Sequence, residues 1–180
     1  GPWCPKNISD GADAGGVWFL DGKLVNVDGA FIASLAKTYG DRKWQLFDPK
    51  TGAVRFTGTL EACEAAARPD VDPAYHNYCV QCLPEYMPKD ATITYVIPLD
   101  PVPVWLAGST NRTGTGIAAN GVRLDGPAPV DAILEAHTIA PFDRCGGHVN
   151  LHVGYHYHAV TDCLAGAPAT VEPANGKAAV

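Results

Sequence analysis

Short apolar runs separated by turn-forming dipeptides dominate the first part of the chain. The run at residues 17–20 is followed by Asp21-Gly22, a dipeptide that accepts the positive φ angles of a tight hairpin turn. The next run, at 23–27, leads through a second Asp-Gly pair into a third run at 30–35. This pattern predicts three antiparallel strands in succession, a β-meander.

A second hairpin is indicated between residues 44 and 57. Its two apolar runs, 44–47 and 53–57, are joined by Asp-Pro-Lys-Thr-Gly, in which Pro presets φ and Gly takes a left-handed conformation. A short helix is predicted over 59–67, because Thr59 can cap it, carboxylates follow early, and strong helix formers continue until shortly before Pro69.

The pattern changes after residue 68. Residues 69–90 are rich in Pro and Tyr and contain Cys79-Val80-Gln81-Cys82, so we expect a loop tied down by disulfides. Residues 91–99 alternate Thr with β-branched and aromatic side chains, which predicts a strand that ends at Pro98. The remaining expected elements are a strand over 102–107, a turn at Asn120-Gly121 and a short helix over 130–137.

These elements predict a mainly β fold, an antiparallel sandwich or partly open barrel with one or two short helices, stapled by disulfides. The 180 residues suit one domain, which we expect over 1–165. Within it, hairpins occupy 15–70 and a histidine-rich region occupies 90–165. The end, 166–180, is rich in Ala and Pro and is expected to be a mobile tail.

Charge and cysteine content narrow the choice of partners and compartment. Thirteen basic against nineteen acidic side chains give a net charge of -6 with no basic stripe, so nucleic acid is not an expected partner. No apolar run approaches the roughly 20 residues that span a bilayer, so no membrane insertion is expected. Six cysteines in so short a chain indicate an oxidising compartment, and we expect a secreted or periplasmic protein with up to three disulfides.

Five of the six histidines lie between residues 137 and 158. Alternate residues of a strand share a face, so His156 and His158 point one way while Tyr155 and Tyr157 point the other. Two imidazoles on one face, about 7 Å apart at the backbone, can converge on one metal ion. The segment therefore predicts half of a metal site.

The third ligand depends on the register of a hairpin. A three-residue connection at 151–153 sets His148 opposite His156, with the two Cβ atoms about 5 Å apart. A two-residue connection would place His148 opposite Tyr155, and a straight strand would spread the histidines too widely for one ion. We prefer the hairpin, because Asn150 and Gly154 both suit a turn.

Several other side chains could take part in the site. In the hairpin His152 lies near the tip, where it need not be a ligand. His137 could serve as a fourth ligand or hydrogen-bond partner, and Asp143 and Glu135 are candidate bases. Three histidines with an open position suit catalytic zinc, and imidazole also suits copper, so the expected cofactor is a transition metal, zinc or copper.

Two cysteines, Cys145 and Cys163, flank the histidine segment, and a disulfide between them would close the base of the hairpin. The alternative is a thiolate ligand on the metal. Cys79-x-x-Cys82 could likewise be a redox pair, but its Pro-rich surroundings favour structural disulfides.

Three motifs carry a resemblance to a known family: Asn120-Gly121-Val122, the segment Asp143-Arg-Cys-Gly-Gly-His148, and Tyr155-His-Tyr-His-Ala159. They resemble the signature of the YHYH-domain proteins, which are largely exported, over roughly residues 90–165. Residues 78–84 are also similar to a segment that often precedes the signature. In that family the Gly-Gly-His and Tyr-His-Tyr-His elements stand close together across a short connection, which favours the hairpin. The resemblance implies no reaction.

Three functions follow from this reading. The first is an exported metal-binding protein that is a metal-dependent hydrolase or hydratase, with a metal ion and an unknown small molecule as partners. The second is a non-catalytic metal carrier or sequestering protein. The third is a metal-independent binding domain whose histidines form a structural hydrogen-bonded cluster. The sequence leaves open whether the protein is an enzyme.

Overall fold

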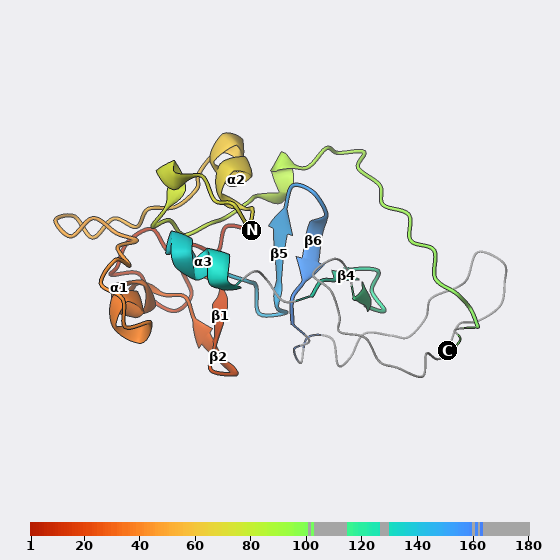
Figure 1. The fold of residues 1–180 in the computed structure, drawn as a ribbon, viewed down its shortest axis with the longest axis horizontal. Coiled ribbons are helices and arrows are strands. Elements are labelled where there is room, and N and C mark those ends of the chain that lie inside the picture. Colours follow the sequence, from red (N-terminus) through yellow and green to blue (C-terminus); the bar gives the residue numbers. More distant parts are fainter. Residues whose placement is uncertain (101, 103–114, 127–129, 160, 162, 164–180) are drawn as a thin grey trace.

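The computed structural model describes residues 1–100, 102, 115–126, 130–159, 161 and 163 (Figure 1). This part of the chain forms two small sheets and three short α-helices, stapled by three disulfides. The helices are α1 (Gly29–Thr38), α2 (Leu60–Ala66) and α3 (Val130–Ala136), and two single 3-10 turns are η1 (Pro73–Tyr75) and η2 (Pro84–Tyr86). The expectation of a small fold built on sheets and stapled by disulfides is confirmed.

The strands pair in two separate sheets. The first is the hairpin of β1 (Val17–Leu20) and β2 (Lys23–Asn26), which confirms the first predicted turn. The second has the order β3-β4-β6-β5, formed by β3 (Gly116–Ile117), β4 (Arg123–Leu124), β5 (Gly147–Asn150) and β6 (Gly154–Tyr157). Within it β4 and β6 are parallel, a departure from the expected antiparallel pairing that joins segments far apart in the chain.

The third run of the expected meander was wrongly assigned to a strand, because residues 29–38 form α1. The Asp28 side chain caps this helix by accepting a 2.7 Å hydrogen bond from the amide of Phe31. Ile32 and Leu35, three residues apart on one helical face, are both buried in the main core. The apolar run therefore has helical spacing, and its Asp-Gly start serves as a cap and not as a hairpin turn.

The second hairpin is present as a turn but not as a pair of long strands. Asp48 holds the turn by accepting bonds from the amides of Lys50 and Thr51, and Gly52 has the expected positive φ of 74°. Only an isolated bridge, Phe47 to Val54, pairs the two runs directly. Residues of the second run also bridge other segments, Ala53 to Asn7 and Phe56 to Cys79.

Other local predictions are confirmed. Helix α2 begins after Thr59, whose side chain accepts a 3.2 Å bond from the amide of Ala62. The Asn120-Gly121 turn joins β3 to β4, with φ of 83° at Gly121. Helix α3 lies where residues 130–137 predict one.

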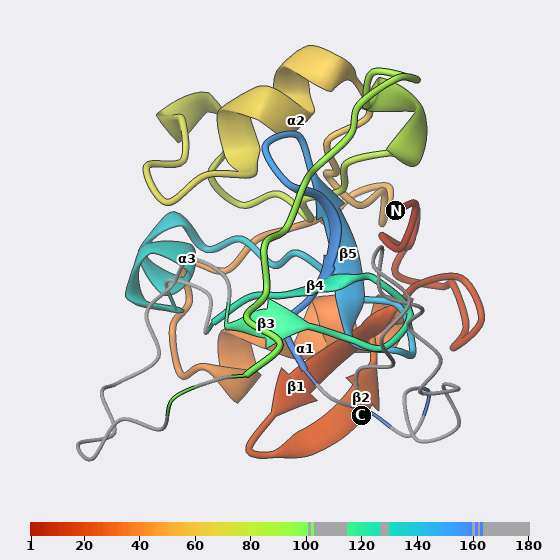
Figure 2. The same cartoon turned by 90° about the vertical axis from the view of Figure 1, so that its right-hand side faces the viewer.

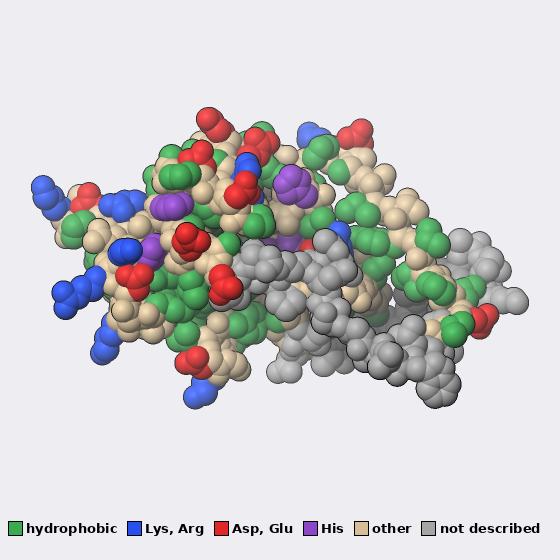
Figure 3. All heavy atoms as spheres, in the orientation of Figure 1, with side chains coloured by type: hydrophobic (Ala, Val, Ile, Leu, Met, Phe, Trp, Pro, Cys, Tyr) green, Lys and Arg blue, Asp and Glu red, His purple; other side chains and the backbone are tan. Residues whose placement is uncertain are grey.

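The strand predicted over 91–99 is wrong. These residues have no regular secondary structure and are exposed, with Val96 92% and Ile97 64% accessible. Figure 1 shows this segment arching away from the body of the protein, and Figure 3 shows apolar side chains along it. The strand predicted over 102–107 and the tail 166–180 lie, apart from residue 102, outside the described residues.

Two clusters of buried side chains and the disulfides hold the fold. The larger cluster packs α1 against other side chains of the first sixty residues and against Cys79 and Ile139, and a smaller one joins Cys63, Cys82 and Val149. The disulfides are Cys4–Cys79, Cys63–Cys82 and Cys145–Cys163. Because Cys79 and Cys82 pair with different partners, they are structural and not a redox pair.

The β5–β6 hairpin lies at the centre of this arrangement. In two perpendicular views α2 lies above the hairpin and the β1–β2 sheet lies below it (Figure 1, Figure 2). An antiparallel bridge from Val17 to Phe142 ties β1 to the chain just before β5. A parallel bridge from Cys79 to Ile139 ties the loop of residues 69–90, called the disulfide loop below, to the same stretch. Two segments of the first half of the chain therefore anchor the stretch that leads into β5.

Candidate metal centre

The β5–β6 hairpin has the register that the sequence predicts. His148 lies directly opposite His156, and residues 151–153 form the three-residue connection. Asn150 stabilises the turn because its Oδ1 accepts 2.9 Å hydrogen bonds from the amides of His152 and Val153. Gly154 closes the turn with a φ of 73°, a region that favours glycine.

A positive φ angle favours glycine at position 146, and a close contact requires glycine at position 147. Gly146 has a φ of 79°, and a Cβ at Gly147 would lie 2.4 Å from the hydroxyl oxygen of Tyr155. That hydroxyl donates a hydrogen bond to Asp143 Oδ2, while Asp143 Oδ1 accepts bonds from the amides of Cys145 and Gly147. Asp143, a candidate base, is thus bound to the turn before β5 and to the tyrosine face of the hairpin.

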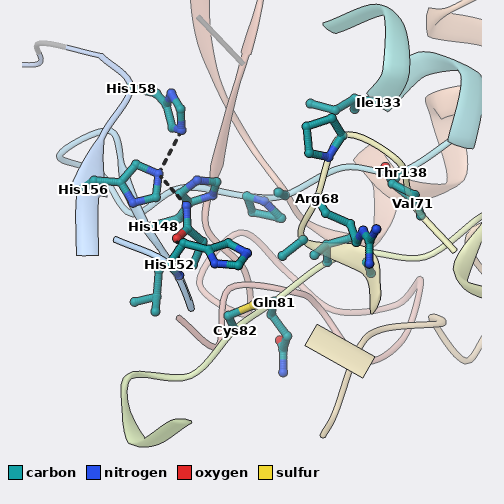
Figure 4. Close-up of a pocket in the computed structure, with 18 of the residues that line it drawn as sticks. Arg68, Val71, Gln81, Cys82, Ile133, Thr138, His148, His152, His156 and His158 are labelled. Carbon is teal, nitrogen blue, oxygen red and sulfur yellow. Dashed lines mark hydrogen bonds between the residues drawn. The ribbon is translucent and has the colours of Figure 1, made fainter. Parts of the chain in front are cut away.

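The structure brings His148, His156 and His158 together. One ring nitrogen from each residue lies within 4.8 Å of the corresponding nitrogens of the other two. The ring centroids are 4.8 to 4.9 Å apart, and the rings converge on one point (Figure 4). His156 is 1% exposed, while the other two keep part of their surface accessible.

Hydrogen bonds at the far side of two rings decide which nitrogen is available. His156 Nδ1 lies 2.9 Å from the carbonyl oxygen of Gly154, and His158 Nδ1 lies 2.9 Å from that of Gly126. A carbonyl oxygen only accepts, so each Nδ1 carries the proton and donates it. In the neutral rings each Nε2 then holds a lone pair, the form in which histidine binds a metal.

These two lone-pair nitrogens, His156 Nε2 and His158 Nε2, are 3.1 Å apart. Two acceptors cannot hydrogen bond to each other. The nearby donor Asn150 Nδ2 lies 3.5 Å from His156 Nε2, which is the outer limit of a hydrogen-bond distance. Two nitrogens at about 2.0 to 2.1 Å from a tetrahedral zinc ion would be about 3.3 Å apart. The observed spacing therefore matches two ligands of one cation.

The surroundings of His148 and His156 favour the neutral form of these two rings. Burial is the largest cause that lowers the pKa of both His148 and His156, and the neighbouring imidazoles lower both further. For His156 the bond to the Gly154 carbonyl acts in the opposite direction. Neutral imidazole is the form that coordinates a metal ion.

Sequence reasoning missed Asp125 as a neighbour of the site. Its Oδ2 lies 3.9 Å from His156 Nε2, while its Oδ1 pairs with Arg123. The parallel pairing of β4 with β6 places it there, since the amide of Asp125 donates to the carbonyl of Tyr157. The Asn120-Gly121 turn in the sequence indicates a strand after it, which is β4. The sequence does not indicate that β4 pairs with β6.

The other candidate residues do not belong to the cluster of converging nitrogens. His152 is exposed at the hairpin tip, and Glu135 is exposed on α3. His137 Nε2 lies 2.8 Å from Asp41 Oδ2, and its ring meets Trp44 edge-on. The pKa of Asp41 is lowered, first by a backbone bond from Lys43 and then by His137.

A cavity of about 290 Å³ opens beside the histidines. The three rings lie on one side of it, and residues after α2, in the disulfide loop and on α3 lie on the others (Figure 4). Asp125 also lines the cavity, beside His156. His152 lines the cavity from the hairpin tip. A metal ion held by the three histidines would therefore have an open side that faces this cavity.

The predicted disulfide Cys145–Cys163 closes the base of the hairpin. Its two cysteines are 18 residues apart, so loop closure alone contributes about 3 kcal/mol to stability in the chain-entropy estimate. Because both sulfur atoms are in the disulfide, neither is a thiolate ligand.

Comparisons with protein-family models, with curated proteins and with solved structures found no match to this chain. Arguments about its function therefore rest on the geometry of the site itself.

Proposed function

We propose that this chain is an exported metal-binding protein in which His148, His156 and His158 hold one zinc or copper ion. The observation that carries the proposal is the pair of Nε2 atoms 3.1 Å apart, on rings whose Nδ1 atoms donate to carbonyl oxygens. A cation between the rings turns this repulsive contact into two bonds. Membership of the YHYH-domain family is part of the proposal, since the resemblance includes these three histidines.

The disulfides support the location. Three disulfides that use all six cysteines are typical of proteins of the cell exterior, the periplasm or the secretory pathway. In the described residues no helix is both long enough and apolar enough to cross a membrane. The proposed compartment is therefore oxidising, outside the cytosol.

A purely structural histidine cluster fits the geometry less well. A direct hydrogen bond between His156 Nε2 and His158 Nε2 requires one ring to be an imidazolium, because both Nδ1 protons are already used. His156 is 1% exposed, and burial disfavours its charged form. A metal ion satisfies both rings without that cost.

The test is elemental analysis of protein purified without a metal-affinity tag and after incubation with zinc or copper and dialysis. We expect about one equivalent of metal in the native protein and none in the double variant His156→Ala/His158→Ala. The matched control is His152→Ala, which removes an exposed imidazole from the same hairpin and should keep the metal. Circular dichroism checks that each variant is folded.

Two results would overturn the proposal. One is native protein that retains neither zinc nor copper after this treatment. The other is loss of metal in His152→Ala to the same extent as in the double variant, because binding would then depend on surface imidazoles and not on the buried cluster.

The cavity favours a metal-dependent hydrolase or hydratase as a second, more specific proposal. A carrier needs ligands that exchange quickly, whereas His156 is buried and the site faces a cavity. Zinc in such a three-histidine site lowers the pKa of bound water to about 7. Asp125, 3.9 Å from His156 Nε2, is placed to accept the proton that such a water releases.

Turnover separates the enzyme from the carrier. The metal-loaded protein should hydrolyse an activated ester such as p-nitrophenyl acetate, or hydrate carbon dioxide, and the double variant should not. Fast transfer of the metal to a chelator without any turnover would contradict the enzyme and support the carrier.

A further inference from the structure

The cavity beside the histidines has walls of two different kinds. One wall carries the three imidazoles and Asp125. The other walls are mainly apolar. Their apolar side chains come from the end of α2 and the residues after it, the disulfide loop, α3, the stretch before β5, and β5. These side chains are Ala66, Ala67, Pro69, Val71, Val80, Ile133, Pro141 and Val149. A ligand that fits must therefore be polar at one end and apolar over the rest of its surface.

The volume limits the size of that ligand. A cavity of about 290 Å³ has the volume of about ten water molecules, each taking about 30 Å³. This corresponds to a ligand of about ten to fifteen non-hydrogen atoms, so only a small molecule can lie wholly inside.

The charges determine the polar end. Two charged side chains line the cavity, Asp125 and Arg68, and each is paired with an opposite charge, Arg123 and Asp70 respectively. A histidine binds a metal ion as a neutral ring, so the three ligands would add no charge. With a divalent ion in place the net charge next to the cavity is positive, which favours an anionic ligand group.

We infer that the cavity binds a small organic anion, such as a carboxylate, whose charged group lies at the metal ion and whose apolar body fills the cavity. This inference rests on the proposed metal site and adds the class of ligand. The apolar walls favour such a ligand over an inorganic anion, which would bind the metal but make no contact with the apolar side chains.

Three probes separate the contributions. 3-Phenylpropanoate carries both the carboxylate and an apolar body of suitable size, acetate carries the carboxylate alone, and 3-phenylpropanol has the body without the charge. Calorimetric titration of the metal-loaded protein should show 3-phenylpropanoate binding at least tenfold more tightly than either of the others.

Variants then place the binding in the cavity. Ile133→Trp and Ala67→Leu enlarge side chains on two different walls and should weaken 3-phenylpropanoate at least tenfold while the metal content stays the same. Two variants are used because either one alone could disturb folding. The matched control, Ile93→Trp, makes the same change as Ile133→Trp at an exposed position in the 91–99 segment and should bind like the native protein.

The outcomes distinguish this inference from the proposed function. Native protein that holds no metal overturns the metal site and this inference with it. Metal-loaded protein that binds acetate or 3-phenylpropanol as tightly as 3-phenylpropanoate overturns this inference alone. The same conclusion follows if both folded cavity variants bind 3-phenylpropanoate as the native protein does.

Discussion

Around the histidines, charged side chains are paired within their own segments. Arg123 pairs with Asp125, two residues along the chain, and Arg68 pairs with Asp70 in the same way. Each pair joins one positive and one negative group, so neither adds net charge to the cavity. A bound cation would therefore dominate the local field.

The Arg68–Asp70 pair makes a prediction about acid titration. The hydrogen bond from Arg68 is the main cause that lowers the pKa of Asp70 from 3.8 to about 2. Because the folded-state pKa is the lower one, the ionised carboxylate contributes stability above about pH 4, and this contribution is lost as the pH falls towards 2. A carboxyl NMR titration should give a midpoint near 2 for native Asp70 and a midpoint raised toward 3.8 in Arg68→Gln.

The control for this titration is Arg42→Gln, which removes an exposed guanidinium elsewhere on the surface and should leave the Asp70 midpoint unchanged. A native midpoint near 3.8 would show that the ion pair does not persist in solution.

At the scale of elements, the β5–β6 hairpin depends on backbone positions that tolerate no side chain. Gly147 lies under the Tyr155 hydroxyl, and the same hydroxyl donates to Asp143. The Gly-Gly-His sequence thus combines a turn residue with positive φ, a strand residue without a side chain and a candidate metal ligand. A larger residue at the second position would push the tyrosine away from its carboxylate and disturb the strand that carries His148.

We therefore expect Gly147→Ala to lower the free energy of unfolding by about 1 to 3 kcal/mol, the usual cost of forcing an extra methyl group into a packed site. Urea denaturation followed by circular dichroism measures the change. The matched control is Gly11→Ala, where no atom lies within 4 Å of the added Cβ, and its effect should stay within about 0.5 kcal/mol. Equal effects for the two variants would show that the Tyr155 contact is not restrictive.

At the scale of the whole molecule, no disulfide joins the part of the chain before residues 91–99 to the part after them. The disulfides join Cys4 to Cys79, Cys63 to Cys82 and Cys145 to Cys163, so none of them crosses this segment. Noncovalent bridges do cross it, including Val17 to Phe142 and Cys79 to Ile139. The connection between the halves is exposed, whereas their contacts are buried.

Limited digestion with thermolysin, which cuts before apolar residues, should cleave within 91–99 before it cleaves β5 or β6. The two fragments should separate on a denaturing gel without reductant, because no disulfide joins them, yet elute together in native size-exclusion chromatography. First cuts within the hairpin, or separation of the fragments under native conditions, would contradict this arrangement.

Local chemistry allowed the sequence by itself to determine several features. The alternation of His and Tyr fixes which side chains share a face, and a three-residue connection with Asn150 and Gly154 fixes the register that sets His148 opposite His156. Helix α2 was equally predictable, because its cap and its helix formers are neighbours in the chain. Such features depend on interactions over a few residues, which spacing and residue type encode.

Only the tertiary structure decided the rest. The run at 30–35 becomes part of α1 because the main core buries its Ile32 and Leu35 face. The segment 91–99 has strand propensity but no partner strand among the described residues, and propensity alone does not form a sheet. Asp125 reaches the histidines through the parallel pairing of β4 with β6, and the cavity exists because α2, α3 and the hairpin enclose it. These contacts join residues distant in the chain, and their free energy depends on how the whole molecule packs, which no local pattern specifies.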